Sequence, residues 1–268
     1  MIKFFRKIRQ NLLSEGKTGK YLKYAIGEII LVVIGILIAL SINNWNDNQK
    51  KIKQETTHLQ NVKNDLKAQI KTLDKYIDFQ NLIIEDSKNI IHHYENNGGF
   101  NKMDSIYPML NDLIVRTTFI NKNISLSEII NSSEINILKN KVLKRKLLEF
   151  NQSVLTFMNT TQNNNTNLID LLIVPTLAKN SDYATYGYTD GMKNYLEKNG
   201  GRVNISYLKN DNLKNGLNQA FNDPKLSLEL MNIVIIRYEL ASLQKVGNET
   251  LKEQAEDILI EITEELDD

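Results

Sequence analysis

The stretch Tyr24 to Ile42, YAIGEIILVVIGILIALSI, is almost continuously apolar and carries a single charge, Glu28. A helix from Ala25 to Ile42 is roughly 27 Å long, close to the hydrocarbon thickness of a bilayer, which is about 30 Å. Because backbone polar groups in that layer must be bonded within their own segment, a helix is the only open-chain structure that fits. The sequence therefore predicts a transmembrane helix within residues 24–45.

The residues on either side of this stretch agree with that prediction. Tyr21 and Tyr24 precede it and Trp45 follows it, which is the placement of aromatic anchors at the two membrane interfaces. Before it lie many basic residues and one acid, Glu15; the basic residues are Lys3, Arg6, Lys7, Arg9, Lys17, Lys20 and Lys23. The positive-inside rule then predicts a cytoplasmic arm over 1–23 and a periplasmic domain over 46–268, with the span in a bacterial inner membrane.

Two alternatives remain open for this leader. Ala39-Leu40-Ser41 resembles a signal-peptide cleavage site, although the basic region is long and the apolar run exceeds a usual signal core, so an uncleaved anchor is favoured. Residues 2–13 place apolar side chains on one helical face among basic ones, which predicts an amphipathic helix on the inner leaflet. A disordered basic arm accounts for the same charges.

One face of the predicted span carries Glu28, Val32, Gly35 and Ala39, because steps of three, four and seven residues return to the same side of a helix. The Gly35-x-x-x-Ala39 spacing allows a second helix to approach closely. We therefore predict that this face packs against another membrane helix, in a homo-oligomer or with another membrane protein. Alternatively, Glu28 lies at the level of the lipid headgroups and has no packing role.

Composition narrows the remaining possibilities. The chain has 268 residues, of which three are Pro and none is Cys. Sparse Pro and Gly favour long helices, and the lack of Cys excludes disulfides, thiolate metal sites and Cys nucleophiles. A formal net charge of +1 gives no reason to expect a nucleic-acid partner. Membrane lipid is the expected contact of the apolar stretch.

The apolar periodicity predicts a mainly α fold, with an antiparallel bundle of long helices after the span. In 50–95, Leu59, Leu66 and Leu73 recur every seven residues with Val62 between them, and Ile70, Ile77, Ile84 and Ile91 repeat beside them. Asn96-Asn97-Gly98-Gly99 is expected to end this helix. Two short helices are predicted next, one over 104–116 and one that starts at a Ser125–Glu128 capping box and ends at Ile130.

Four further helices are predicted over 134–173, 211–221, 224–245 and 249–266. Ser133 is the expected cap of the first of these, and Asp223-Pro224 is the expected start of the third. Pro175 is expected to end or kink the helix over 134–173, and Gly247 is expected to end or bend the helix over 224–245. Residues 178–206 are expected to form a loop with a possible hairpin.

Few residues suggest chemistry. His92 and Glu95 have a spacing that can share a metal, but a single pair is a weak signal, and we predict no metal site and no cofactor. No Ser, His and Asp occur in a nucleophile context and no glycine-rich phosphate loop is present, so no catalytic residues are predicted and the protein is not expected to be an enzyme. Tyr183, Tyr186 and Tyr188 offer amphipathic rings near two Asp residues and form the best candidate recognition loop.

The opening of the chain, FFRKIRQNLLSEGKTGKYLKYAIGEIILVVIGILIAL followed by INNWN, resembles the DUF6090 family of Bacteroidota membrane proteins. The stretch TTFINKNISLSEIINSSEINILKNKVLKRKLLEF at 117–150 is similar to the middle of that family's domain. The resemblance implies one N-terminal span and a mostly helical extracytoplasmic part, and it brings no activity or site residues.

Three functions are compatible with these features. The favoured one is a scaffold or accessory subunit of an envelope complex, because long apolar-striped helices follow an anchor with a packing face. The second is a periplasmic sensor whose bundle binds a ligand and signals through a partner, since only the short arm lies on the cytoplasmic side. An envelope hydrolase is the least favoured, because no nucleophile–base set is visible.

Overall fold

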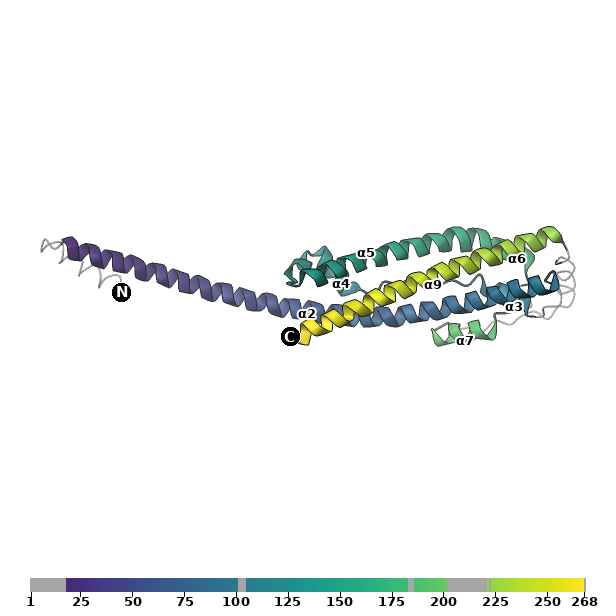
Figure 1. The fold of residues 1–268 in the computed structure, drawn as a ribbon, viewed down its shortest axis with the longest axis horizontal. Helices are drawn as coiled ribbons and strands as arrows, with labels where there is room; N and C mark the ends of the chain where they lie inside the picture. Colours follow the sequence, from purple (N-terminus) through teal and green to yellow (C-terminus); the bar gives the residue numbers. More distant parts are fainter. Residues whose placement is uncertain (1–17, 101–104, 183–185, 202–220, 222, 268) are drawn as a thin grey trace. The chain divides into compact units, whose positions relative to one another are not determined.

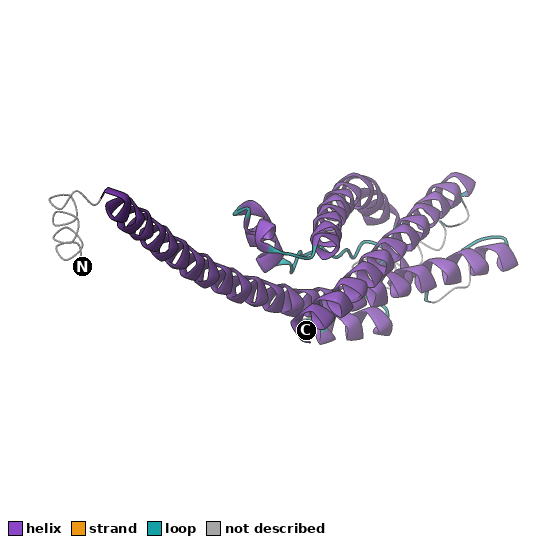
Figure 2. Cartoon of the chain, turned by 60° about the vertical axis from the view of Figure 1, so that its left-hand side comes forward, coloured by secondary structure: helices purple, strands orange, loops and turns teal. Residues whose placement is uncertain are grey.

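The computed structural model describes residues 18–100, 105–182, 186–201, 221 and 223–267, with only the backbone of Tyr21. These residues are mainly helical, and none of them forms a strand (Figures 1 and 2). The elements in chain order are α2 (Thr18–Asn97), α3 (Ile106–Asp112), α4 (Ile124–Asn131), the 3₁₀ helix η1 (Glu134–Ile137), α5 (Lys141–Asn164), the π-helix η2 (Asn165–Ile173), α6 (Val174–Asn180), α7 (Asp190–Lys198) and α9 (Pro224–Asp267). The chain forms two compact units, residues 1–57 and 58–268.

Helix α2 is one continuous helix of 80 residues. It runs without interruption through the polar patch NNWNDNQ, which lies between the predicted span and the predicted helix over 50–95. Asn and Asp cost only a few tenths of a kcal/mol in a helix, and here the Asn43 amide donates to Asp47 Oδ2 at 3.3 Å, one turn further on. The predicted end is confirmed: α2 stops at Asn97 and Gly98 has φ +67°, a conformation that favours glycine.

In the first unit, α2 contains a stretch that is long and apolar enough to cross a membrane. None of the most apolar 18-residue window is buried within the chain. Its large side chains lie on every side of the helix and are all exposed; they are Ile26, Ile29, Ile30, Leu31, Val32, Val33, Ile34, Ile36, Leu37, Ile38, Leu40 and Ile42.

The second unit is built on two heptad series of α2. The predicted series of Leu59, Leu66 and Leu73 is buried and continues through Gln80 and Ser87. The second buried series starts at Val62 and continues through Gln69, Tyr76, Ile83 and Ile90. The predicted isoleucine series is only half-buried and flanks these rows. The buried rows contain the polar residues Gln69, Gln80 and Ser87. Apolar periodicity alone therefore pointed to the neighbouring isoleucines as the buried series.

Helix α9 runs beside α2 and α5. Between α2 and α9, Asp74 contacts Lys252 at 2.7 Å and Gln80 contacts Gln244 at 3.0 Å. As the residue number rises along α2, the number of the contacted residue on α9 therefore falls. The contacts of α5 with α9 behave in the same way, since Asn140 contacts Glu265 and Lys146 contacts Glu261.

Two short helices differ from their predictions. Helix α3 begins at Ile106, directly after the predicted cap residue Ser105, but the Ser105 side chain makes no capping bond and the helix already ends at Asp112. Helix α4 begins at Ile124, so Ser125 lies inside it and the predicted capping box does not form. Instead the Ser125 N–H donates to Asp65 Oδ2 of α2 at 2.6 Å, because a carboxylate from a packed helix can also satisfy a free N-terminal donor.

The predicted helix over 134–173 is also different. Ser133 has φ +64°, and α5 begins only at Lys141, where Asn140 accepts hydrogen bonds from the N–H groups of Val142 and Leu143 at 3.1 Å each. Pro175 does not end the helix. The π-helix η2 precedes it, the N–H of Val174 bonds to the carbonyl of Ile169, and Pro175 then lies in the first turn of α6, where its missing N–H is tolerated.

The C-terminal region contains one correction and one confirmation. Part of the predicted 178–206 loop is helix α7, which Thr189 caps by accepting from Met192 N–H at 3.2 Å. Asp223 begins α9 as predicted and accepts from Lys225 N–H at 2.9 Å. Residues 211–220 of the predicted helix over 211–221 lie outside the described residues. The two predicted last helices are one, α9.

Gly247 lies inside α9, at a position where the Phe157 ring of α5 occupies the space that a side chain would need. A Cβ at residue 247 would lie 2.1 Å from Phe157 Cε2. Phe157 in turn meets Phe119 edge-on, with ring centroids 5.3 Å apart. The glycine therefore allows a close approach of α5 and α9 rather than ending or bending the helix.

We predict that Gly247→Ala lowers the free energy of unfolding by about 1–2 kcal/mol, because the cost of overpacking exceeds the helix propensity that Ala adds. In a Phe157→Ala background the sign reverses, since the ring is gone and Ala then stabilises the helix by about 1 kcal/mol. Denaturant unfolding of the two single variants and the double variant measures this. Gly99→Ala, where no atom lies within 4 Å, is the control. A destabilisation of equal size in both backgrounds would refute the packing explanation.

Candidate functional site

The predicted membrane-helix residues lie in the apolar stretch of α2. Val32, Gly35 and Ala39 are exposed, and Glu28 is half-exposed. Of the predicted interface anchors, Tyr24 and Trp45 are also exposed, and the Tyr21 side chain is outside the described residues. Val32, Gly35 and Ala39 are therefore accessible to another helix or to lipid, and the packing role of this face stays a prediction.

The predicted recognition loop lies against the second unit. Tyr183 is outside the described residues, and Tyr186 and Tyr188 are half-buried against the apolar cluster that surrounds α3. The Tyr186 ring stacks on Tyr107 of α3, with centroids 4.7 Å apart and an interplanar angle of 17°. The loop is thus held on a helical support, and recognition by it stays a prediction.

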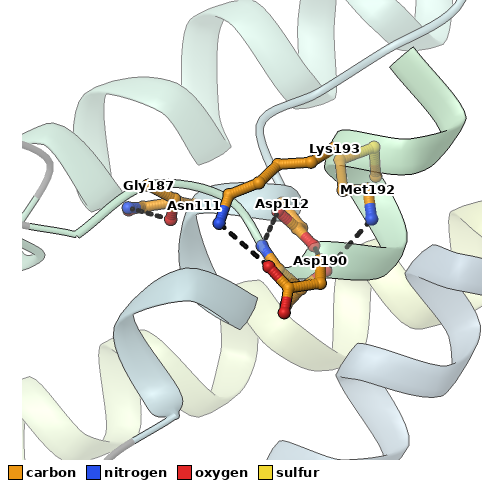
Figure 3. Close-up of polar contacts among 7 residues, drawn as sticks. Asn111, Asp112, Gly187, Asp190, Met192 and Lys193 are labelled. Atoms are coloured by element: carbon orange, nitrogen blue, oxygen red, sulfur yellow. Dashed lines mark hydrogen bonds and ion pairs between the residues drawn. The ribbon is translucent and has the colours of Figure 1, made fainter. Parts of the chain in front are cut away.

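Two residues at the end of α3 fix this loop and the start of α7 (Figure 3). The Asn111 amide donates to the carbonyls of Tyr186 at 2.8 Å and Gly187 at 3.1 Å. Asp112 accepts from the Thr189 N–H at 3.2 Å and also from its hydroxyl. The same hydroxyl oxygen caps α7, so Asp112 determines where that helix begins.

Asp112 also forms a buried carboxyl pair with Asp86 of α2. Burial raises the pKa of Asp86 to about 8, and the neighbouring Asp112 and Glu85 add to the rise. Burial raises the pKa of Asp112 to about 6, a rise that the hydrogen bonds from Thr189 and Asp86 limit. At neutral pH the two carboxyls therefore share a proton, because burial disfavours two adjacent negative charges.

A second feature is a non-helical segment that packs on the helices of the second unit. Residues 115–123, which we call the strap, have no regular secondary structure, although Phe119 and Asn123 are buried. Buried backbone groups need hydrogen-bond partners, and here no sheet supplies them. Side chains do so instead: Tyr76 donates to the Thr118 carbonyl at 2.8 Å and accepts from Ile120 N–H at 3.0 Å.

Further side chains from three helices bond to the strap and its start. Asn165 of η2 donates to the Thr117 carbonyl at 2.9 Å, and Gln69 of α2 accepts from Lys122 N–H at 2.7 Å. Arg237 of α9 donates to the carbonyls of Leu113 and Val115, both at 2.9 Å. The strap is therefore the element that ties α2, η2 and α9 together.

Arg237 is the largest fully buried side chain of the described residues. Burial lowers the pKa of its guanidinium to about 9, so it remains charged at neutral pH. Its cation lies at the C-terminal end of α3, where the helix dipole and free carbonyls favour positive charge.

No group of three or more potential metal-ligating side chains occurs among the described residues. His92 and Glu95, the weak pair in the sequence, lie near the exposed end of α2, and His92 contacts the Asn96 amide at 2.9 Å. Neither the strap nor the carboxyl pair was found by sequence reasoning. The β-branched and aromatic residues of VRTTFI were a signal for a non-helical segment, whereas Asp86 and Asp112 are 26 residues apart and no local pattern links them.

The carboxyl pair predicts a pH dependence of stability. The unfolded pKa of Asp is about 3.9, so between about pH 4 and pH 8 the folded protein binds more protons than the unfolded chain. The free energy of unfolding should therefore fall as pH rises through this window, by up to about 1.4 kcal/mol per pH unit for one proton. Asp86→Asn, whose amide still donates to Asp112, should flatten this fall and make the variant more stable than the native protein at pH 8.

Urea unfolding at pH 5, 6.5 and 8 measures the effect, with Glu95→Gln at an exposed position near the end of α2 as the control. Parallel pH profiles for the native protein and Asp86→Asn would show that the pair does not hold the proton.

Comparison with known proteins identifies one family. Residues 28–153 match DUF6090, described as a family of unknown function, and no curated protein and no solved structure matches. The matched region includes most of the apolar stretch, the buried heptads of α2, α3, the strap and α4, and it ends inside α5. The predicted resemblance is therefore confirmed: over residues 28–153 the chain matches the DUF6090 family, whose function is unknown.

Proposed function

We propose that this protein is a single-pass protein of a bacterial inner membrane whose periplasmic helical domain acts as a scaffold or accessory subunit of an envelope complex. The observation that carries the proposal is the apolar stretch of α2, none of which is buried within the chain. Lipid is the environment in which such a surface is stable.

Two further observations support the topology and the fold. The basic residues before the stretch favour a cytoplasmic N-terminus and a periplasmic domain. The opposite order of paired positions along α2 and α9, and along α5 and α9, supports an antiparallel bundle. A packed bundle of long helices on an anchor suits a structural role, because it presents a large, rigid surface to partners.

The second candidate is a periplasmic sensor that signals through a partner. The buried Asp86–Asp112 pair, which fixes the start of α7, favours it, because a change in protonation there would alter the loop that carries Tyr186 and Tyr188. A scaffold should be isolated in a stable complex irrespective of pH. A sensor of this kind should change its partners between pH 6 and pH 8.

We predict that Gly35→Leu lowers the amount of partner, or of second copy, recovered with the protein in mild detergent by about tenfold, equivalent to about 1.4 kcal/mol. The larger side chain would prevent the close approach that the Gly35–Ala39 spacing allows. Affinity purification of differently tagged copies, followed by mass spectrometry, measures both kinds of association.

Gly27→Leu is the matched control, because a Cβ added at Gly27 would also meet no atom within 4 Å and Gly27 lies on a different face of the helix. Equal recovery with Gly35→Leu and Gly27→Leu would exclude the face of Glu28, Val32, Gly35 and Ala39 as the contact. A protein recovered alone, with no second copy and no partner, would contradict the scaffold itself.

A further inference from the structure

A small cavity lies inside the second unit, beside the strap. The aromatic rings of Phe119 and Phe157 form part of its wall, and polar side chains from α2, α5 and α9 form another part. The space that the centre of a water-sized sphere can occupy is about 10 Å³. A cavity of this size is close to the lower limit for one water molecule, about 10–15 Å³ by the same measure.

Four buried polar atoms around this cavity have no hydrogen-bond partner among the described residues. They are Gln80 Oε1, Thr161 Oγ1, Gln244 Nε2 and Asn248 Oδ1. Each of these side chains is more than nine-tenths buried. A buried polar group without a partner destabilises the folded state, so four such atoms around one space are unfavourable unless something bonds to them.

The chemistry of the four atoms identifies what can bond to them. The Gln80 amide already donates to Gln244 Oε1 at 3.0 Å, and a single amide–amide bond leaves one acceptor and one donor over, whichever way round the two amides are oriented. Thr161 adds a hydroxyl, which donates or accepts, and Asn248 adds an amide oxygen. The set therefore offers both acceptors and donors.

We propose that Gln80, Thr161, Gln244 and Asn248 bind one internal water molecule. Water has two hydrogens and two lone pairs, so it can donate to the oxygens of Gln80 and Asn248 and accept from the Gln244 amide and the Thr161 hydroxyl. A cation would face the N–H of Gln244, and an anion would face two amide oxygens. An organic ligand is too large for the space.

The position of this water site explains a discontinuity in the core. The buried apolar residues form two separate clusters, and on α9 one ends at Ala241 while the other begins at Leu251. Gln244 and Asn248 lie between these two residues. Thr161 has the equivalent position in α5 and η2, between Phe157 and Ile169. The water would bridge the three long helices at the level where apolar contact between them is interrupted.

The direction in which Thr161→Val changes the melting temperature tests the proposal. Thr161→Val has nearly the same shape as the native residue but cannot bond to water. If the site holds water, the variant loses a hydrogen bond and the melting temperature of the full-length protein in detergent falls by about 2–4 °C. If the cavity is dry, the variant removes an unpaired hydroxyl and the melting temperature rises. Thr160→Val, at the adjacent exposed position of α5, is the control.

A crystal structure of the full-length protein at a resolution that shows ordered water gives the second measurement. We expect one water within hydrogen-bonding distance of at least three of the four side chains. An unchanged or higher melting temperature of Thr161→Val relative to Thr160→Val, or a cavity without water density, would overturn the proposal.

Discussion

The structure depends first on an apolar surface that the chain does not cover. Twelve large aliphatic side chains between Ile26 and Ile42 are exposed. Covering side chains of this kind is worth about 1.5–3 kcal/mol each, so the group as a whole represents on the order of 20 kcal/mol. An exposed apolar surface of this extent favours association or insertion into a membrane. In the function proposed above, a bilayer covers it.

The helical unit meets a different constraint, which is the backbone of the strap. A non-helical segment that packs on a helical bundle has no neighbouring strand, so its buried carbonyl and N–H groups must bond to side chains. Tyr76, Asn165 and Arg237 supply such bonds from three different helices. This explains why polar Gln69 and Tyr76 occupy a buried row of α2 that would otherwise be apolar.

The sequence was sufficient to predict what depends on local periodicity and composition. It predicted the apolar stretch, the Leu59–Leu66–Leu73 row, the end of α2 at Gly98 and the Asp223 start of α9. It was insufficient where tertiary contacts overrode local signals. Gly247 indicated an end or a bend, but it makes room for the Phe157 ring within a continuous helix. Pro175 indicated an end or a kink, but it lies in the first turn of α6, directly after the π-helix η2. The capping box at Ser125 does not form, because Asp65 of α2 accepts the hydrogen bond from the Ser125 N–H instead. The Asp86–Asp112 pair consists of residues that only the fold brings together.

The central claim is that α2 crosses a membrane with the N-terminal arm inside the cell and the helical domain outside. The chain contains no Cys, so single cysteines report their location without background. Labelling of Ser14→Cys in the arm and Lys198→Cys at the exposed end of α7, with a membrane-impermeant maleimide on intact spheroplasts, is the most direct test. The account predicts that Lys198→Cys is labelled at once and Ser14→Cys only after the membrane is permeabilised. Protection of Lys198→Cys in intact spheroplasts, or labelling of both positions, would contradict it.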